Sequence, residues 1–123
     1  MITDVYHLFK PGMNLHRGFN VFRWIRGQEG DAYVSSPRKN EHVDKYVGAS
    51  WDWENYSMGW LLEQYLKNVA DRKKEKEYFV AQVIRESMQW LDENYDQDKF
   101  FLWVDCFDPH EPWDPSLSLS KNV

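Results

Sequence analysis

The chain has 123 residues, of which 42% are hydrophobic and 28% are charged, a composition typical of one folded domain or of part of a larger one. Its formal net charge of −5 argues against a nucleic acid as partner, because binding to phosphates needs clustered lysine and arginine. No apolar stretch is long enough to cross a membrane, so we expect no membrane span. Cys106 is the only cysteine, and its place in an apolar run suggests a small core residue.

The first predicted element is a short strand at residues 2–6, which is followed by His7 and by turn-forming residues at Pro11 and Gly12. Residues 15–47 show little hydrophobic periodicity, and we interpret them mostly as loop. A connection of this length in a compact protein either builds a site or contains an unrecognised element. The sequence leaves these two alternatives open.

Two helices are predicted in the second half of the chain. Residues 55–69 carry apolar side chains at helical spacing, although Gly59 weakens the start of that helix. Residues 74–95 show the clearest pattern, an amphipathic helix whose polar side chains point away from one apolar face. That apolar face is predicted to contain Val80, Ile84, Met88, Leu91 and Tyr95.

A strand is predicted at residues 100–106, "FFLWVDC", where the apolar run shows no alternation with polar residues. Such a run is typical of a strand covered by helices on both faces, which implies a mostly parallel sheet in an α/β fold. If the first and last strands are parallel, their carboxyl ends lie at the same edge of the sheet, where ligands bind in open α/β sheets. We therefore expect His7, Asp108 and His110 to face one crevice.

The residues at this edge allow more than one interpretation. A histidine after a strand can simply cap a turn, and this is as reasonable for His7 as a functional role. For His110, which stands between prolines just after a buried strand, we favour a functional role. Asp108, His110 and Asp114 also carry the donor atoms that Zn²⁺ or Mn²⁺ accepts, although acidic residues beside loop prolines are common.

The remaining histidines and aromatic residues receive structural interpretations. His16 and His42 are expected to be structural or surface residues. Four aromatic residues could form a stacking platform for a sugar, but core packing is the simpler explanation for most of them. These four are Trp51, Trp53, Tyr56 and Trp60.

Three stretches of the sequence resemble the middle of a type I sulfatase. They are "DVYHLFKPGMNLHRGF", "WIRGQEGDAY" and "FFLWVDCFDPHEPWDP", which start at residues 4, 24 and 100. Type I sulfatases, which include the arylsulfatases, belong to the alkaline phosphatase superfamily together with phosphodiesterases and phosphonate monoester hydrolases. The likeness extends from Thr3 to Pro115, and its most specific part is the Pro-His-x-Pro element that begins at Pro109.

This resemblance implies an architecture as well as an activity. Residues 1–115 would be the central part of a sulfatase catalytic domain, an incomplete α/β/α sandwich with a mostly parallel sheet. Residues 116–123 depart from the family's usual continuation and are expected to form an atypical, disordered tail.

The resemblance also implies roles for individual residues. The histidine of the Pro-His-x-Pro element contacts the sulfate and helps the leaving oxygen to depart, so His110 is carried over as catalytic and substrate-binding, with Asp108 beside it as a second substrate-binding residue. A Lys-x-His pair at the end of an earlier strand holds the sulfate and the nucleophile. Here that place reads Val5-Tyr6-His7, so His7 is carried over as catalytic and the lysine is missing. Because the phosphodiesterase and phosphonate branch also lacks that lysine, the group hydrolysed stays open.

The nucleophile and the metal ligands of that family have no counterpart in these 123 residues. In sulfatases the nucleophile is the first residue of Cys-x-Pro-x-Arg or Ser-x-Pro-x-Arg after its oxidation to formylglycine, and the residues after Cys106 do not match this motif. Formylglycine and Ca²⁺, or another divalent cation, would therefore come from the rest of a parent protein, and this chain alone is expected to be inactive. The expected substrate is a sulfate ester, with sulfated carbohydrates as candidates. The alternative is a non-catalytic domain that binds a sugar or a metal.

Overall fold

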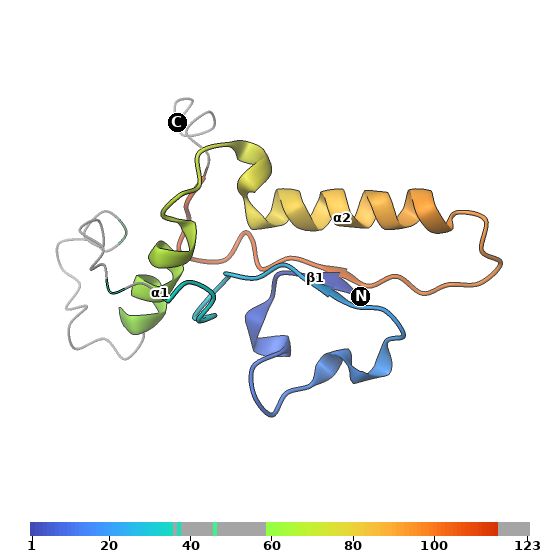
Figure 1. Cartoon of the computed structure of the whole chain (residues 1–123), viewed down its shortest axis with the longest axis horizontal. Helices are drawn as coiled ribbons and strands as arrows, with labels where there is room; N and C mark the ends of the chain where they lie inside the picture. Colours follow the sequence, from blue (N-terminus) through green and yellow to red (C-terminus); the bar gives the residue numbers. More distant parts are fainter. Residues whose placement is uncertain (36, 38–45, 47–58, 116–123) are drawn as a thin grey trace.

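The computed structural model describes residues 1–35, 37, 46 and 59–115 (Figure 1). Some predicted features lie outside these residues, namely positions 55–58 of the first helix, His42, Trp51, Trp53, Tyr56 and the tail at 116–123. Among the described helices, none combines the length and the apolar character needed to cross a bilayer.

Three short strands form one parallel sheet with β1 at its centre. β1 spans Ile2–Thr3, β2 spans Arg23–Trp24 and β3 spans Val104–Asp105, and their order in the sheet is β2-β1-β3. In register, Ile2 lies between Arg23 and Val104, and both pairs of strands run in the same direction. The α/β class and the parallel alignment of the first and last predicted strands are therefore confirmed.

The strands are shorter than predicted, and one of them was not predicted. After the two residues of β1 the chain soon enters a 3₁₀ helix, η1, at Tyr6–Leu8. Only two residues of the apolar run at 100–106 form β3, while Phe100 and Phe101 are exposed. β2 falls within residues 15–47, so the interpretation of that segment as loop is wrong at this point.

Both predicted helices are confirmed within the described residues. α1 spans Gly59–Val69, and α2 spans Phe79–Asn94. The second helix begins later than predicted, because Glu75–Glu77 forms a separate 3₁₀ helix, η4. The Glu77 carboxylate accepts two backbone N–H groups that precede this turn, at 2.7 and 2.9 Å. Tyr78 is then extended, with φ −69° and ψ 143°, so α2 can start only after it.

The face of α2 that packs on the sheet differs from the apolar face predicted from periodicity. α2 lies along one side of the sheet (Figure 1) and buries Val83 and Ser87. Ile84, Met88 and Tyr95, which belong to the predicted face, are exposed by 48%, 61% and 81%. Ser87 can be buried because its hydroxyl donates a hydrogen bond to the Val83 carbonyl at 2.7 Å. A serine whose hydroxyl is hydrogen-bonded thus occupies the packed face of α2, and a search for apolar residues alone could not find it.

The other side of the sheet is covered by η1 and by a second 3₁₀ helix, η2, at Leu15–Gly18 (Figure 1). The aromatic ring of Trp24, from β2, stacks on Phe9 with a centroid separation of 4.7 Å. Because side chains alternate along a strand, this layer packs on the face of the sheet opposite α2. Its apolar cluster consists of Met1, Val5, Leu8, Phe9, Phe19 and Phe107.

Candidate functional site

Asp4 joins the ends of the two neighbouring strands β1 and β3. Its side chain is fully buried, and its Oδ1 accepts a hydrogen bond from the Phe107 N–H at 2.8 Å. Its Oδ2 is also buried and has no hydrogen-bond partner among the described residues. Burial raises the pKa of Asp4 to about 6, although the Phe107 N–H acts in the opposite direction. The segment that leaves β3 is therefore fixed to the segment that leaves β1.

Asp114 anchors the other end of the segment that leaves β3. Its carboxylate forms an ion pair with Arg72, whose side chain is only 9% exposed. The Arg72 guanidinium lies 3.7 Å from the centre of the Tyr78 ring, and Tyr65 donates a long hydrogen bond of 3.4 Å to Asp114. Residues 107–114, which we call the site loop, are thus attached at both ends to buried groups.

His110 lies in the middle of the site loop and is exposed to solvent, with 61% of its side chain accessible. Its backbone N–H donates to the Phe107 carbonyl at 3.1 Å, and its ring is 4.4 Å from the Phe107 ring. The ring Nδ1 is 3.0 Å from the carbonyl oxygen of Glu111. Because a carbonyl oxygen only accepts hydrogen bonds, this contact makes Nδ1 the donor and leaves Nε2 for another partner.

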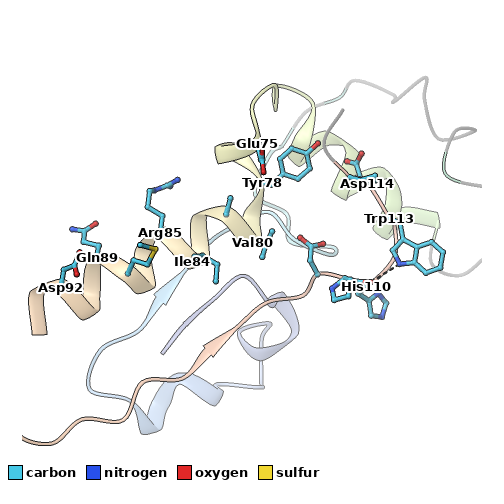
Figure 2. A pocket seen from close by; sticks show the side chains of 15 residues that line it. Glu75, Tyr78, Val80, Ile84, Arg85, Gln89, Asp92, His110, Trp113 and Asp114 are labelled. Carbon is cyan, nitrogen blue, oxygen red and sulfur yellow. Dashed lines mark hydrogen bonds between the residues drawn. The ribbon is translucent and has the colours of Figure 1, made fainter. Parts of the chain in front are cut away.

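A groove of about 950 Å³ runs between the site loop and α2. Figure 2 shows His110 and Trp113 on the loop side of this groove and Ile84 on the helix side. Asp108 also lines it, and burial raises the pKa of its carboxyl group while the positive charge of Arg72 opposes the rise. Part of the exposed apolar face of α2 therefore forms one wall of the groove that contains two of the predicted site residues.

His7 lies in η1, directly after β1, and is held by a carboxylate from a distant turn. Its backbone N–H donates to Oε2 of Glu29 at 3.1 Å, and its Nδ1 is 3.1 Å from Oε1 of the same side chain. Half of the His7 side chain is accessible, while Glu29 is 17% exposed. Sequence reasoning missed Glu29, because a glutamate in the stretch Gly27-Gln28-Glu29-Gly30 has the composition of an ordinary exposed turn.

The chain segments that carry His7 and His110 lie at one edge of the sheet, but their rings have different partners: Glu29 for His7 and the Glu111 carbonyl for His110. No hydrogen bond or ion pair links the two rings in the described part of the chain. The groove beside His110 is not lined by His7. Phe107 connects the two surroundings, because its ring contacts His110 and also packs on the cluster that contains Leu8, the residue after His7.

The metal site considered for Asp108, His110 and Asp114 is not formed. Asp114 is paired with Arg72, which removes one of the three required donors. Within residues 1–35, 37, 46 and 59–115, no group of three or more His, Cys, Asp or Glu side chains is arranged to hold a metal ion. The alternative of a Zn²⁺ or Mn²⁺ site at these three residues is therefore wrong, while the cation implied by the sulfatase resemblance is assigned to other segments of a parent protein.

The remaining sequence interpretations have mixed outcomes. His16 is structural as predicted, since it packs against Phe22 with a ring separation of 4.5 Å. Trp60 is 60% exposed, so core packing is wrong for this residue. Cys106 is half-buried and contributes to no described metal site, and burial raises its pKa to about 11. Val5, at the place of the sulfatase lysine, is only 4% exposed and belongs to the apolar cluster.

No protein family model, curated protein or solved structure matches this chain. The likeness to type I sulfatases therefore rests on the sequence motifs themselves.

Proposed function

We propose that this chain is the central part of a sulfatase-type hydrolase that cleaves sulfate esters, with the nucleophile and the metal ion supplied by other segments of a parent protein. In this proposal His110 is the general acid and a sulfate contact, and His7 is the partner of the nucleophile. Asp108 is the second contact to the substrate. The isolated chain has no hydrolytic activity.

The observation that supports this proposal is the parallel pairing of β1 and β3. Ile2 pairs with Val104, so the chain segments that carry His7 and His110 leave the sheet at the same edge, although about a hundred residues separate them in sequence. The Pro-His-x-Pro segment is held at both ends, and a catalytic group needs such support to be kept in a productive position.

The surroundings of His110 suit a proton donor. Its Nδ1 is occupied by the Glu111 carbonyl, and the exposed ring leaves Nε2 for the substrate. The protonated imidazole carries a hydrogen on Nε2 as well, and it can give this hydrogen to the departing oxygen of an ester. Burial raises the pKa of the Asp108 carboxyl above its ordinary value, because this group is partly shielded from water in the groove beside His110.

A second candidate is hydrolysis of a phosphodiester or a phosphonate monoester. Val5 favours it, because this side chain is packed in the apolar cluster where type I sulfatases place a lysine. The edge of the sheet therefore lacks one of the cations that the family uses to bind sulfate. The buried position of Val5 also means that a lysine introduced there would have to leave the cluster before it could reach a substrate.

The flanking reading frame gives the first test. We expect Cys-x-Pro-x-Arg or Ser-x-Pro-x-Arg upstream of these residues, and a complete upstream frame without either motif would contradict the proposal. The parent protein should then be assayed in parallel with an aryl sulfate and an aryl phosphodiester. A higher kcat/KM for the phosphodiester would replace the first candidate by the second.

The role of His110 is tested by His110→Ala in the same parent protein. Loss of a general acid lowers kcat by roughly 10²–10⁴-fold. Asp98→Asn, in the exposed turn after α2, is the control and should leave kcat unchanged. A His110→Ala variant with wild-type kcat would exclude His110 as the proton donor.

A further inference from the structure

The turn that carries Glu29 is built to hold its backbone in one position. Asp31 is 2% exposed, and its carboxylate accepts two hydrogen bonds from Arg26, at 2.7 and 2.6 Å, and one from the Gly27 N–H at 2.9 Å. Asn68 of α1 donates to the carbonyl oxygens of Gly27 and Asp31 at 2.7 and 2.8 Å. The turn is thus fixed internally by an ion pair and externally by a helix.

Glu29 itself has an unfavourable backbone conformation. Its φ is +55°, in the left-handed region that residues other than glycine rarely adopt. Glu29 stands between Gln28 and Gly30, at a position where glycine would be the easiest residue to accommodate. Backbone strain of this kind persists where the surrounding structure enforces it, and it is concentrated at functional positions.

The Glu29 side chain uses both carboxylate oxygens on one residue. Oε2 accepts the His7 backbone N–H, and Oε1 lies 3.1 Å from the His7 ring Nδ1. A carboxylate can only accept hydrogen bonds, so a hydrogen bond at Nδ1 requires the proton to be on that nitrogen. In the neutral ring, Nε2 is then left with a free lone pair.

We propose that Glu29 is the positioning residue of His7: it fixes the neutral imidazole in the form protonated on Nδ1 and presents Nε2 as a hydrogen-bond acceptor. The backbone contact sets the place of the residue, and the ring contact sets its orientation and its tautomer. The catalytic meaning of this arrangement rests on the proposed function, since it would let His7 accept a proton while His110 donates one. The arrangement itself can be measured without any reaction.

The test is NMR of the full chain labelled with ¹⁵N in the histidine rings, recorded at alkaline pH where imidazoles are neutral. The ¹⁵N shifts of the two ring nitrogens report which one carries the proton. We expect wild-type His7 to be protonated mainly on Nδ1. In Glu29→Gln the ratio of the two tautomers should move toward Nε2 by roughly tenfold, because a charged acceptor is replaced by an amide whose oxygen accepts more weakly and whose NH₂ group can donate to Nδ1.

Two further variants show whether the tautomer of His7 depends on the Glu29 side chain itself. Glu29→Gly removes the side chain and suits the positive φ, so it should shift the His7 tautomer as Glu29→Gln does. Glu111→Gln is the matched control, because Glu111 lies 3.3 Å from His110 Nδ1 and should not affect His7.

The proposal is overturned if wild-type His7 is protonated mainly on Nε2, a result that needs no variant. It is also overturned if both substitutions at Glu29 leave the His7 tautomer ratio within about twofold of wild type, well below the effect of a charged partner. Neither outcome depends on sulfatase activity. An absence of sulfate ester hydrolysis by the parent protein would remove the proposed function and leave the tautomer result intact.

Discussion

Asp4→Asn should make the stability of this protein less dependent on pH. Asp4 is fully buried; one carboxylate oxygen accepts a hydrogen bond from the Phe107 N–H, and the other has no partner within the part of the chain that the structure describes. Burial and the nearby Asp108 carboxyl raise its pKa from 3.8 to about 6. The folded protein therefore binds this proton more tightly than the unfolded chain does, and the protonated form is the one that favours folding.

The sign and the magnitude follow from that pKa. The stabilising contribution of protonated Asp4 is complete below about pH 4 and is lost as the pH rises through 6. Because each tenfold change in a protonation equilibrium corresponds to about 1.4 kcal/mol, the loss amounts to about 3 kcal/mol. Asparagine keeps the acceptor for the Phe107 N–H and has no charge to bury, so the variant should gain stability relative to wild type as the pH increases.

Urea denaturation at several pH values between 4 and 8 measures this difference. The free energy of unfolding of Asp4→Asn minus that of wild type should increase by about 2.4 kcal/mol from pH 4 to pH 8, with most of the change below pH 6. Asp98→Asn is the control, because Asp98 is exposed and its substitution should give the same small difference at every pH. A constant difference for Asp4→Asn as well would refute the assignment of a raised pKa to Asp4.

Two further predictions concern Gly27 and Cys106. Gly27→Ala should lower the free energy of unfolding by about 1–3 kcal/mol because of the positive φ at this position. The loss should be larger still, because the added methyl group would lie 2.9 Å from the Phe79 ring. The control is Gly12→Ala, where φ is +96° and no atom of the described residues lies near the added methyl group, and this variant should lose less stability in the same denaturation assay. The Cys106 thiol should react with N-ethylmaleimide at neutral pH about a hundredfold more slowly than an ordinary thiol, because its pKa is raised from 9.0 to about 11. Equal loss of stability in both glycine variants, or rapid labelling of the folded protein, would contradict these expectations.

The order of the main elements could be predicted from the sequence because their apolar residues have clear periods or run lengths. The parallel pairing of the first and last strands followed from the unbroken apolar run before Asp105. The extent of that strand could not be predicted, since hydrophobicity does not show that Phe100 and Phe101 stay outside the sheet. β2 was missed because Arg23 and Trp24 show no alternation, and Arg23 is stabilised in the sheet by an ion pair with a helix residue that is distant in sequence.

The sequence predicted which segments build the candidate site, but it did not reveal the residues that hold those segments in place. His7, Asp108 and His110 were placed at one edge of the sheet by topology alone. Glu29 and Asp4 could not be found in the same way, because each acts through a hydrogen bond to a residue more than twenty positions away. Composition gives a charged residue the same appearance whether it is solvated or bound to such a distant partner.

The site loop is attached to the rest of the fold at two points that belong to different segments of the chain. One attachment is the hydrogen bond to the Asp4 carboxylate after β1, and the other is the ion pair with Arg72 in the connection after α1. Because the two attachments are independent, loss of either one would free one end of the site loop and leave His110 held from the other end only.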